Sequence, residues 1–553
     1  MGHLGDSLNV NKLKLASQLR RLLTWFSRDR VEPWLLAGAV AVTRFVFRSR
    51  DLYDLDSVNF ALAIQRFDPR VHQPHPPGYF LYICLGRIMN SLVHNANLAL
   101  VILSIAASCG AVFIVHRMAL EWFGRREAQF AGILFLFSPL AWFHGTVALT
   151  YSVEAFFSAL IGYLCWRLIC GNVAWIVPTG LILGISAGVR PSSLLFLGPL
   201  FLFSLRGAAP GRIVAGLTAL FATLGAWFFP MIWASGGFGS YFGALLSLWQ
   251  MVPSKDTVFN SSPATSIARA CTIVFIYFLC FGAASLAPLG KTRRSIPDAV
   301  QKKTFTAVWI APALCFFTFI FLKFVNSGYL LLLSAPACLW LACWISEWYE
   351  NVGWRRPFKL ALMGACAAAN ISIFLASPLY CSYRSVRRFE AELEGIRTAL
   401  PQFGSPEDTL IIGFDSHFLG YRHAGYYLPG YLTIEYPEVD LREGTRIFAM
   451  HDRDTRLLTG LPPVSYSKFV LFPLPGGEVS YEQYLKKVTK QVPQQSLHTV
   501  RLEGHDFVTG SVVDLPLLFP VVASQPKPAV YAPLHSGMPL VNSRTHPLPW
   551  QGP

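Results

Sequence analysis

The chain has 553 residues, of which 53% are hydrophobic and 14% are charged, and its formal net charge is +15. About 25% of the residues in a soluble globular domain are charged, so this composition excludes an ordinary water-soluble protein. The positive charge does not indicate nucleic-acid binding, because Lys and Arg gather in short loops between apolar runs, where they orient membrane helices. The sequence therefore predicts a polytopic membrane protein without a nucleic-acid partner.

The apolar runs predict a bundle of membrane spans. A span needs roughly 20 residues, and segments near that length lie at residues 31–49, 78–93, 97–119, 127–147, 150–170, 173–189, 191–206, 211–233, 267–288, 304–322, 327–346 and 358–378. Segments 78–93 and 191–206 are short. If every segment crossed, both ends of the chain would lie on one side, so we expect 78–93, which carries Arg87, to be re-entrant or to share a crossing.

The basic loops predict the orientation of the bundle, because Lys and Arg stay on the cytoplasmic side. The residues concerned are Arg117, Arg125, Arg126, Arg206, Arg212, Lys291, Arg293, Arg294, Lys302, Lys303, Arg355, Arg356 and Lys359. This places the first loop and everything after residue 380 outside the cytoplasm. All cysteines lie at or before Cys381, which fits the periplasmic side of a bacterial inner (plasma) membrane, although an endoplasmic reticulum lumen is compatible as well.

The composition divides the chain into four parts. Residues 1–30 form a basic cytoplasmic N-terminus, 31–380 the multi-pass domain, 385–523 a small α/β extracytoplasmic domain, and 524–553 an irregular tail rich in Pro. The third part is predicted from a helix and β-rich stretches at residues 387–400, 408–414, 445–450, 468–474 and 498–504. The expected fold class is therefore mainly α, a transmembrane helical bundle with a small C-terminal α/β domain.

The loop of residues 50–77 is the first candidate for a functional site. It holds Asp54, Asp56, His72 and His75, and ionisable groups beside a membrane helix must be solvated, paired or functional. A short amphipathic helix on the membrane surface is predicted from Ser57 onward. One of the two aspartates is expected to cap it, which leaves the other carboxylate for chemistry.

The prolines after His72 predict a rigid segment around both imidazoles, since proline fixes its own φ and restricts the residue before it. For His72 a surface role is the simpler interpretation. The segment ends at Gly78 and Tyr79. The spacing of the two histidines does not by itself predict zinc, which needs three or four ligands.

Later outer segments supply further candidates. Glu154 begins a span and is either a solvated helix end or a second acid of the site, while Arg190 lies at a break before Pro191 and either receives a phosphate or reaches the interface. Lys255, Lys323 and Tyr329 lie in predicted outer loops. None of these residues is diagnostic alone.

Together these motifs resemble the GT-C glycosyltransferases, and most of all the protein mannosyltransferase and aminoarabinose transferase group. The resemblance covers roughly residues 30–235 and rests on Asp54-x-Asp56, SVNFALAIQRFD, His75-Pro76-Pro77-Gly78-Tyr79, FGRREAQFAGILFLFSP and TYSVEAFF. The chain departs from the group at two places: relatives read Lys-Pro-Pro at residues 75–77, and they tend to have Thr-Asp at residues 151–154.

The resemblance implies transfer of a sugar, with inversion, from a polyprenyl (or dolichyl) phosphate donor to a glycan, lipid or protein acceptor outside the cytoplasm. In the mechanism that we hypothesise, Asp56 is the general base and Asp54 or Glu154 orients the acceptor or tunes that base. Arg190, with His75 or Lys255, stabilises the leaving phosphate. A divalent metal bridging the acids is an alternative that the spacing does not support.

Two other functions compete with an enzyme. A transporter or flippase for a lipid-linked sugar would have charges at mid-membrane, whereas the charges here gather at one face. A catalytically inactive GT-C-like scaffold is the second alternative, and the missing Lys of the Lys-Pro-Pro motif is its best argument.

Overall fold

The computed structural model divides into two compact units, Met1–Glu390 and Ala391–Pro553, each of which is described by itself. The structure describes residues 28–251, 257, 262–289, 296–379, 381–413, 417–435, 441–442, 447–458, 466–471, 497–502, 505–511 and 521–522. The expected tail at residues 524–553 and the expected N-terminal part before residue 28 lie outside these ranges.

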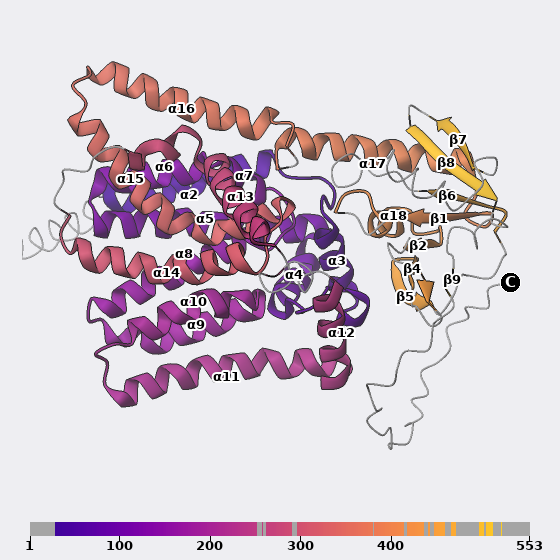
Figure 1. Cartoon of the computed structure of the whole chain (residues 1–553), viewed down its shortest axis with the longest axis horizontal. Coiled ribbons are helices and arrows are strands. Elements are labelled where there is room, and N and C mark those ends of the chain that lie inside the picture. The colour runs from indigo at the N-terminus through magenta and orange to yellow at the C-terminus, as the bar shows by residue number, and fades with distance from the viewer. Residues whose placement is uncertain are drawn as a thin grey trace, which may run out of the picture. The chain divides into compact units, whose positions relative to one another are not determined.

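The first unit is a helical bundle (Figure 1). Its α-helices are α2 (Arg28–Val46), α3 (Leu55–Gln65), α4 (Phe80–Val93), α5 (Ala96–Trp122), α6 (Arg125–Leu136), α7 (Pro139–His144), α8 (Tyr151–Ile169), α9 (Ile176–Val189), α10 (Ser192–Ser204), α11 (Pro210–Ala234), α12 (Phe238–Met251), α13 (Pro263–Phe281), α14 (Ala299–Phe319), α15 (Ser334–Asn351) and α16 (Arg356–Ala376). The 3-10 helices are η1 (Pro69–Val71), η2 (Val173–Trp175), η3 (Gly282–Leu289) and η4 (Phe324–Leu333).

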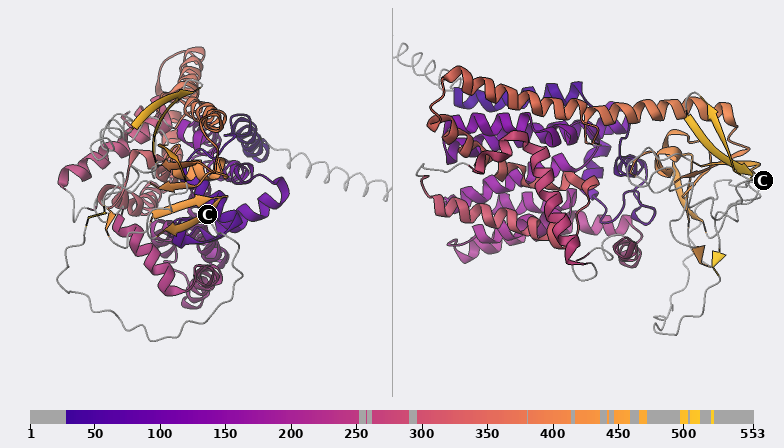
Figure 2. Two further views of the ribbon diagram at one scale, coloured as in Figure 1. Left: turned by 90° about the vertical axis from the view of Figure 1, so that its right-hand side faces the viewer. Right: turned by 45° about the horizontal axis from the view of Figure 1, so that its top comes forward.

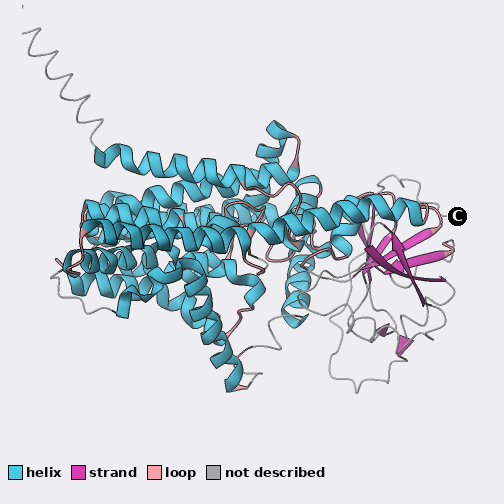
Figure 3. Cartoon of the chain, turned by 90° about the horizontal axis from the view of Figure 1, so that it is seen from above, coloured by secondary structure: helices cyan, strands magenta, loops and turns pink. Residues whose placement is uncertain are grey.

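The long helices run along one another, as Figure 3 shows from above. The central helix α5 has 27 residues, about 40 Å at 1.5 Å per residue, and packs against α2, α4, α6 and α8. Among the described residues, six helices are long and apolar enough to cross a membrane: Ala96–Trp122, Tyr151–Ile169, Pro210–Ala234, Pro263–Leu286, Ser327–Asn351 and Arg356–Ala376. The chain is an integral membrane protein, as its composition predicts.

Several predicted spans are shorter or broken in the structure. The predicted segment 127–147 is two helices, because Ser138 caps α7 with its side chain and Pro139 occupies the first helical position. Helix α4 has 14 residues, about 21 Å, which is too short for a full crossing. A capping serine and a proline therefore divide an apolar run that hydropathy alone joins.

A short helix lies where one was predicted after Asp54, but the prediction that it is amphipathic and lies at a surface was wrong. Helix α3 begins at Leu55, and every residue from Ser57 to Ile64 is buried. Its neighbours α4 and α5 pack against it, so α3 has no polar face to present to water. The apolar positions that suit a membrane surface suit the interior of a bundle equally well.

The second unit holds a mixed sheet, preceded by α17 (Tyr383–Phe403), which begins in the first unit. The strands are β1 (Thr409–Gly413), β2 (Thr433–Glu435), β3 (Leu441–Arg442), β4 (Ile447–His451), β5 (Asp454–Leu458), β6 (Lys468–Leu471), β7 (Leu497–Leu502), β8 (His505–Ser511) and β9 (Val521–Val522). The order of the main sheet is β5-β4-β2-β1-β6-β8-β7, and Figure 2 shows the strands of this unit in two further views.

Strands β1, β2 and β6 pair in parallel, and helix α18 (Tyr421–Tyr427) connects β1 with β2. The outer pairs of the sheet are antiparallel. The expected fold class, a helical membrane bundle followed by a small α/β part, is confirmed.

Helices α9 and α11 are in close contact through glycines. A Cβ on Gly180 would lie 2.3 Å from the backbone oxygen of Gly216, whereas a Cβ on Gly198 of α10 would meet only Leu194, at 3.9 Å. Gly180→Ala should therefore destabilise the bundle by about 1–3 kcal/mol, the usual cost of overpacking. Thermal unfolding of the purified protein in detergent measures the effect.

Gly198→Ala is the matched control and should be neutral or stabilising, since alanine is the better helix former. Equal unfolding midpoints for the two variants would contradict the close approach of α9 and α11.

Candidate functional site

The two aspartates of the first loop have different environments. Asp54 is the N-cap of α3: its Oδ1 accepts a hydrogen bond of 2.9 Å from the backbone N–H of Asp56, and the residue is 7% exposed. Asp56 lies in the first turn, and its side chain is 24% exposed. Since Asp54 is committed to the cap, Asp56 is the carboxylate that remains accessible.

Asp56 begins a chain of polar contacts that runs through His75 to Tyr79. The Asp56 Oδ1 lies 3.2 Å from His75 Nδ1, and His75 Nε2 lies 3.1 Å from the Tyr79 hydroxyl. His75 Nδ1 has no hydrogen-bond partner among the described residues, so its approach to the carboxylate is close but lacks the geometry of a hydrogen bond. Nε2 and the Tyr79 hydroxyl share a hydrogen bond whose direction depends on the tautomer. Tyr79 is held in the left-handed region at φ 46° and packs edge-on against Phe60 of α3.

A buried ion pair lies beside this chain. Arg190 Nε is 3.0 Å from Glu154 Oε2, and the two side chains are 5% and 1% exposed. The guanidinium also donates to Thr150 Oγ1 at 2.5 Å, while Glu154 accepts from the Ser192 hydroxyl at 3.0 Å. The pair therefore links the start of α8 to the break between α9 and α10.

Three tyrosine rings surround the same guanidinium. The Arg190 Cζ lies 4.6 Å from the ring centre of Tyr151, 4.4 Å from that of Tyr329 and 5.9 Å from that of Tyr79. Cation–π attraction is strongest where water is excluded. Arg190 thus joins α8, η4 and the start of α4 into one cluster with the Asp56–His75–Tyr79 chain.

His144 is a member of this region that the sequence does not single out. It is 1% exposed, its ring packs 4.9 Å from Tyr151, and it lies within electrostatic range of Asp54 and Arg190. Neither ring nitrogen has a hydrogen-bond partner among the described residues. His144 ends α7, a helix that appears only when the break at Pro139 is recognised, whereas Thr150, Tyr151 and Ser192 adjoin predicted residues and could have been named.

Asp68 and Arg70 stabilise the loop between α3 and α4. Burial opposes ionisation of Asp68, but hydrogen bonds from Arg70 outweigh it and lower the pKa of Asp68. Asp68 Oδ1 accepts from the Arg70 backbone and Nε at 3.1 and 2.8 Å. Asp68 therefore caps η1 and shapes the loop.

The remaining predicted residues lie outside the contacts above. His72 is the C-cap of η1 in the left-handed region at φ 57°, and Lys323 is exposed immediately before η4. Lys255 lies outside the described residues. In the part of the chain that the structure describes, no three His, Cys, Asp or Glu side chains are placed to hold a metal ion.

Comparison with known proteins gives two kinds of match. A family model described as the protein O-mannosyl-transferase TMEM260 N-terminal domain matches residues 68–208, which include His75, Tyr79, Glu154 and Arg190 but neither Asp54 nor Asp56. No curated protein is significantly similar to the chain.

Among solved structures, ArnT from Cupriavidus metallidurans bound to undecaprenyl phosphate is 12% identical, with a TM-score of 0.51 over 86% of this chain and 97% of that chain. The same protein in the apo state has a TM-score of 0.51 and 12% identity over 88% and 98%. This chain has the GT-C fold. The resemblance drawn from the motifs is confirmed at the level of the fold, over nearly the full length of ArnT.

The N-cap assignment predicts a difference between two substitutions at Asp54. Asp54→Ala removes the acceptor for the α3 backbone and should destabilise the protein by about 1 kcal/mol. Asp54→Asn keeps an equally good cap and should unfold at nearly the wild-type temperature. Equal losses for Ala and Asn in thermal unfolding would show that the negative charge of Asp54, and not its cap, matters for stability.

The buried pair predicts a large loss of stability when one partner is removed. Glu154→Gln leaves the Arg190 guanidinium buried without its counter-charge, which typically costs about 3–5 kcal/mol. The matched control is Glu121→Gln: Glu121 of α5 pairs with Arg167 of α8, and the two side chains are 29% and 34% exposed.

Exposed pairs contribute about 0–1 kcal/mol, so Glu121→Gln should barely move the thermal midpoint in detergent. If the two glutamine variants lost similar stability, the Arg190–Glu154 pair would not be the organising contact of the cluster.

Proposed function

We propose that the chain is a membrane glycosyltransferase that moves a sugar from a polyprenyl-phosphate donor to an acceptor hydroxyl. The observation that carries the proposal is the accessible Asp56 carboxylate, which lies 3.2 Å from His75 and near a buried cation in a GT-C fold. ArnT, which shares the fold, is known bound to undecaprenyl phosphate, and this supports a polyprenyl-phosphate donor for this chain.

Asp56 is the proposed general base. It accepts the proton of the acceptor hydroxyl while the new bond to the anomeric carbon forms and the bond from that carbon to the phosphate oxygen breaks, with the electron pair leaving on the polyprenyl phosphate. Such assistance is typically worth about 10²–10⁴-fold. Displacement from the face opposite the leaving group inverts the anomeric carbon.

His75 has the second role, because it contacts the base directly. Its Nδ1 lies 3.2 Å from the Asp56 carboxylate, and the hydrogen bond between Nε2 and the Tyr79 hydroxyl orients the ring. Nδ1 is buried and Nε2 is hydrogen-bonded to the Tyr79 hydroxyl, so His75 is proposed to position the base and is assigned no hydrogen bond to the donor phosphate.

Arg190 supplies positive potential to the leaving phosphate in this proposal. Its side chain is 5% exposed and already compensated by Glu154, so its effect acts over distance, through Tyr79 and the low-dielectric interior. Glu154 holds Arg190 in place, and Asp54 holds the helix that carries Asp56. The proposal therefore assigns chemistry to Asp56 and Arg190, and positioning to His75, Glu154 and Asp54.

The test is sugar transfer by the purified full-length protein from radiolabelled polyprenyl-phosphate sugars, beginning with mannose because of the matching family model. The acceptors are a panel of glycan, lipid and peptide hydroxyls. Asp56→Asn should lower kcat by about 10²–10⁴-fold. Asp54→Asn, which preserves the cap, should retain most of the activity.

Two results would overturn the proposal at different levels. If Asp54→Asn abolished transfer and Asp56→Asn retained it, the base would be misassigned. If the wild-type protein transferred no sugar from any donor of the panel, the chain would be an inactive scaffold with the GT-C fold.

A further inference from the structure

A group of basic residues lies at the end of the helical unit opposite the Asp56–Glu154 cluster. Helices α5 and α15 end there, and α6 and α16 begin there with Arg125 and Arg356. The first backbone N–H groups of a helix have no partner within the helix and attract anions. Two helix N-termini and their arginines therefore meet at this end of the bundle.

The positive charge at this end is only partly compensated. Arg125 pairs with Glu32, and Arg126 pairs with Glu350. In the described part of the chain, no ion pair to a carboxylate is formed by Arg356 or Lys359; Lys359 donates to the backbone oxygen of Tyr349 and lies 5.0 Å from the centre of its ring.

Below the charges lie two cavities on either side of α16. The first, of about 860 Å³, is bounded by Glu32, Arg126, Tyr349 and Arg356 at its polar end, and Leu36 and Leu360 are among the apolar residues that line the rest.

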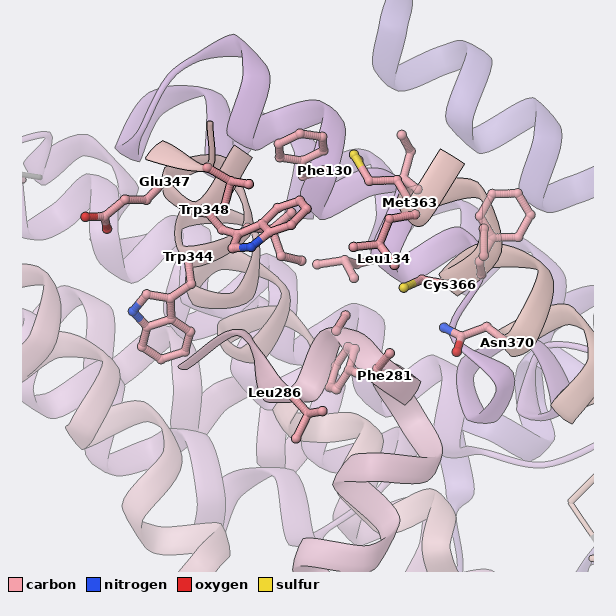
Figure 4. A pocket seen from close by; sticks show the side chains of 18 of the residues that line it. Phe130, Leu134, Phe281, Leu286, Trp344, Glu347, Trp348, Met363, Cys366 and Asn370 are labelled. Atoms are coloured by element: carbon pink, nitrogen blue, oxygen red, sulfur yellow. The ribbon is translucent and has the colours of Figure 1, made fainter. Parts of the chain in front are cut away.

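The second cavity, of about 470 Å³, lies between α16, α15 and η3, and Figure 4 shows Trp344, Trp348 and Leu286 around it. Phe130, Ile133 and Met363 line both cavities.

We propose that this end of the bundle binds one anionic glycerophospholipid, with its headgroup phosphate between Arg126 and Arg356. Two apolar cavities that share a wall and open beneath one basic group match a molecule with two acyl chains and one negative headgroup. The binding site is independent of the proposed sugar transfer and lies at the other end of α5.

The depth of the site in the membrane supports a lipid over a soluble anion. Helix α16 is a candidate span that starts at Arg356, so the arginine lies at the level where lipid phosphates lie. The ring centres of Trp348 and Trp354 are 6.0 Å apart, and Trp354 precedes Arg356 by two residues. Tryptophan is enriched at the membrane–water interface. Basic pockets between spanning helices are known to receive anionic headgroups.

The experiment measures lipid retention by native mass spectrometry of the full-length protein in detergent with equal amounts of phosphatidylglycerol and phosphatidylcholine. The wild-type protein should retain one phosphatidylglycerol in preference to phosphatidylcholine. A cation near a lipid phosphate is worth about 1 kcal/mol, which is about fivefold. The double variant Arg126→Gln/Arg356→Gln should therefore lower the preference by about 25-fold.

The matched control is Arg206→Gln/Arg212→Gln, which removes the same charge at the same end of the bundle from exposed residues that line neither cavity. It should keep the preference. Arg126→Lys/Arg356→Lys, which keeps the charge, should keep most of it and shows that loss in the glutamine variant is not misfolding.

Three results would overturn the inference. The first is equal retention of the two lipids by the wild-type protein. The second is an equal loss of the preference in both glutamine variants, which would indicate a general charge effect. Displacement of the lipid by glycerol 1-phosphate at equal concentration would show that the site takes a free phosphate and does not use the acyl chains.

Discussion

The buried pair of Arg190 and Glu154 is the contact on which the geometry of the candidate site depends. Removing two charges from water is costly unless they meet each other and satisfy their remaining hydrogen-bonding groups. Here Thr150 and Ser192 complete the pair, and tyrosine rings surround the cation. Because these groups come from α8, the α9–α10 break and η4, the pair can form only when all three are in place.

The arrangement of side chains around this pair also bears on the different environments of Asp54 and Asp56. Arg190 Cζ lies 5.9 Å from the ring centre of Tyr79, and the Tyr79 hydroxyl is hydrogen-bonded to His75. The buried pair therefore adjoins the residues that contact Asp56. Asp54 does not take part in these contacts, because its side chain accepts a hydrogen bond from the α3 backbone. A sequence with two equivalent acids thus becomes a structure with one capping acid and one accessible acid.

The sequence predicted the class of fold and most members of the site, because those features depend on local signals. Apolar length identifies membrane helices, and Asp54 preceding an apolar run identifies a helix start. The burial of α3 could not be predicted, since its apolar positions are compatible with a membrane surface and with a protein interior. The pairing of Glu154 with Arg190 joins residues 36 positions apart in sequence, and His144 becomes visible only after α7 is separated from α6.

The charged residues at the two ends of the helical unit are arranged differently, and the two proposals assign different functions to these ends. At one end Arg190 and Glu154 are buried and paired, which fixes their geometry, and Asp56 remains accessible for the proton transfer proposed above. At the other end Arg356 and Lys359 lack carboxylate partners in the described ranges, which leaves attraction for an anion outside the protein. A site that must hold atoms within a few tenths of an ångström needs the first arrangement, whereas an attachment to lipid needs only the second. The two ends are about 40 Å apart along α5, and apolar side chains lie between them. Substitutions at one end should therefore leave the other end unchanged.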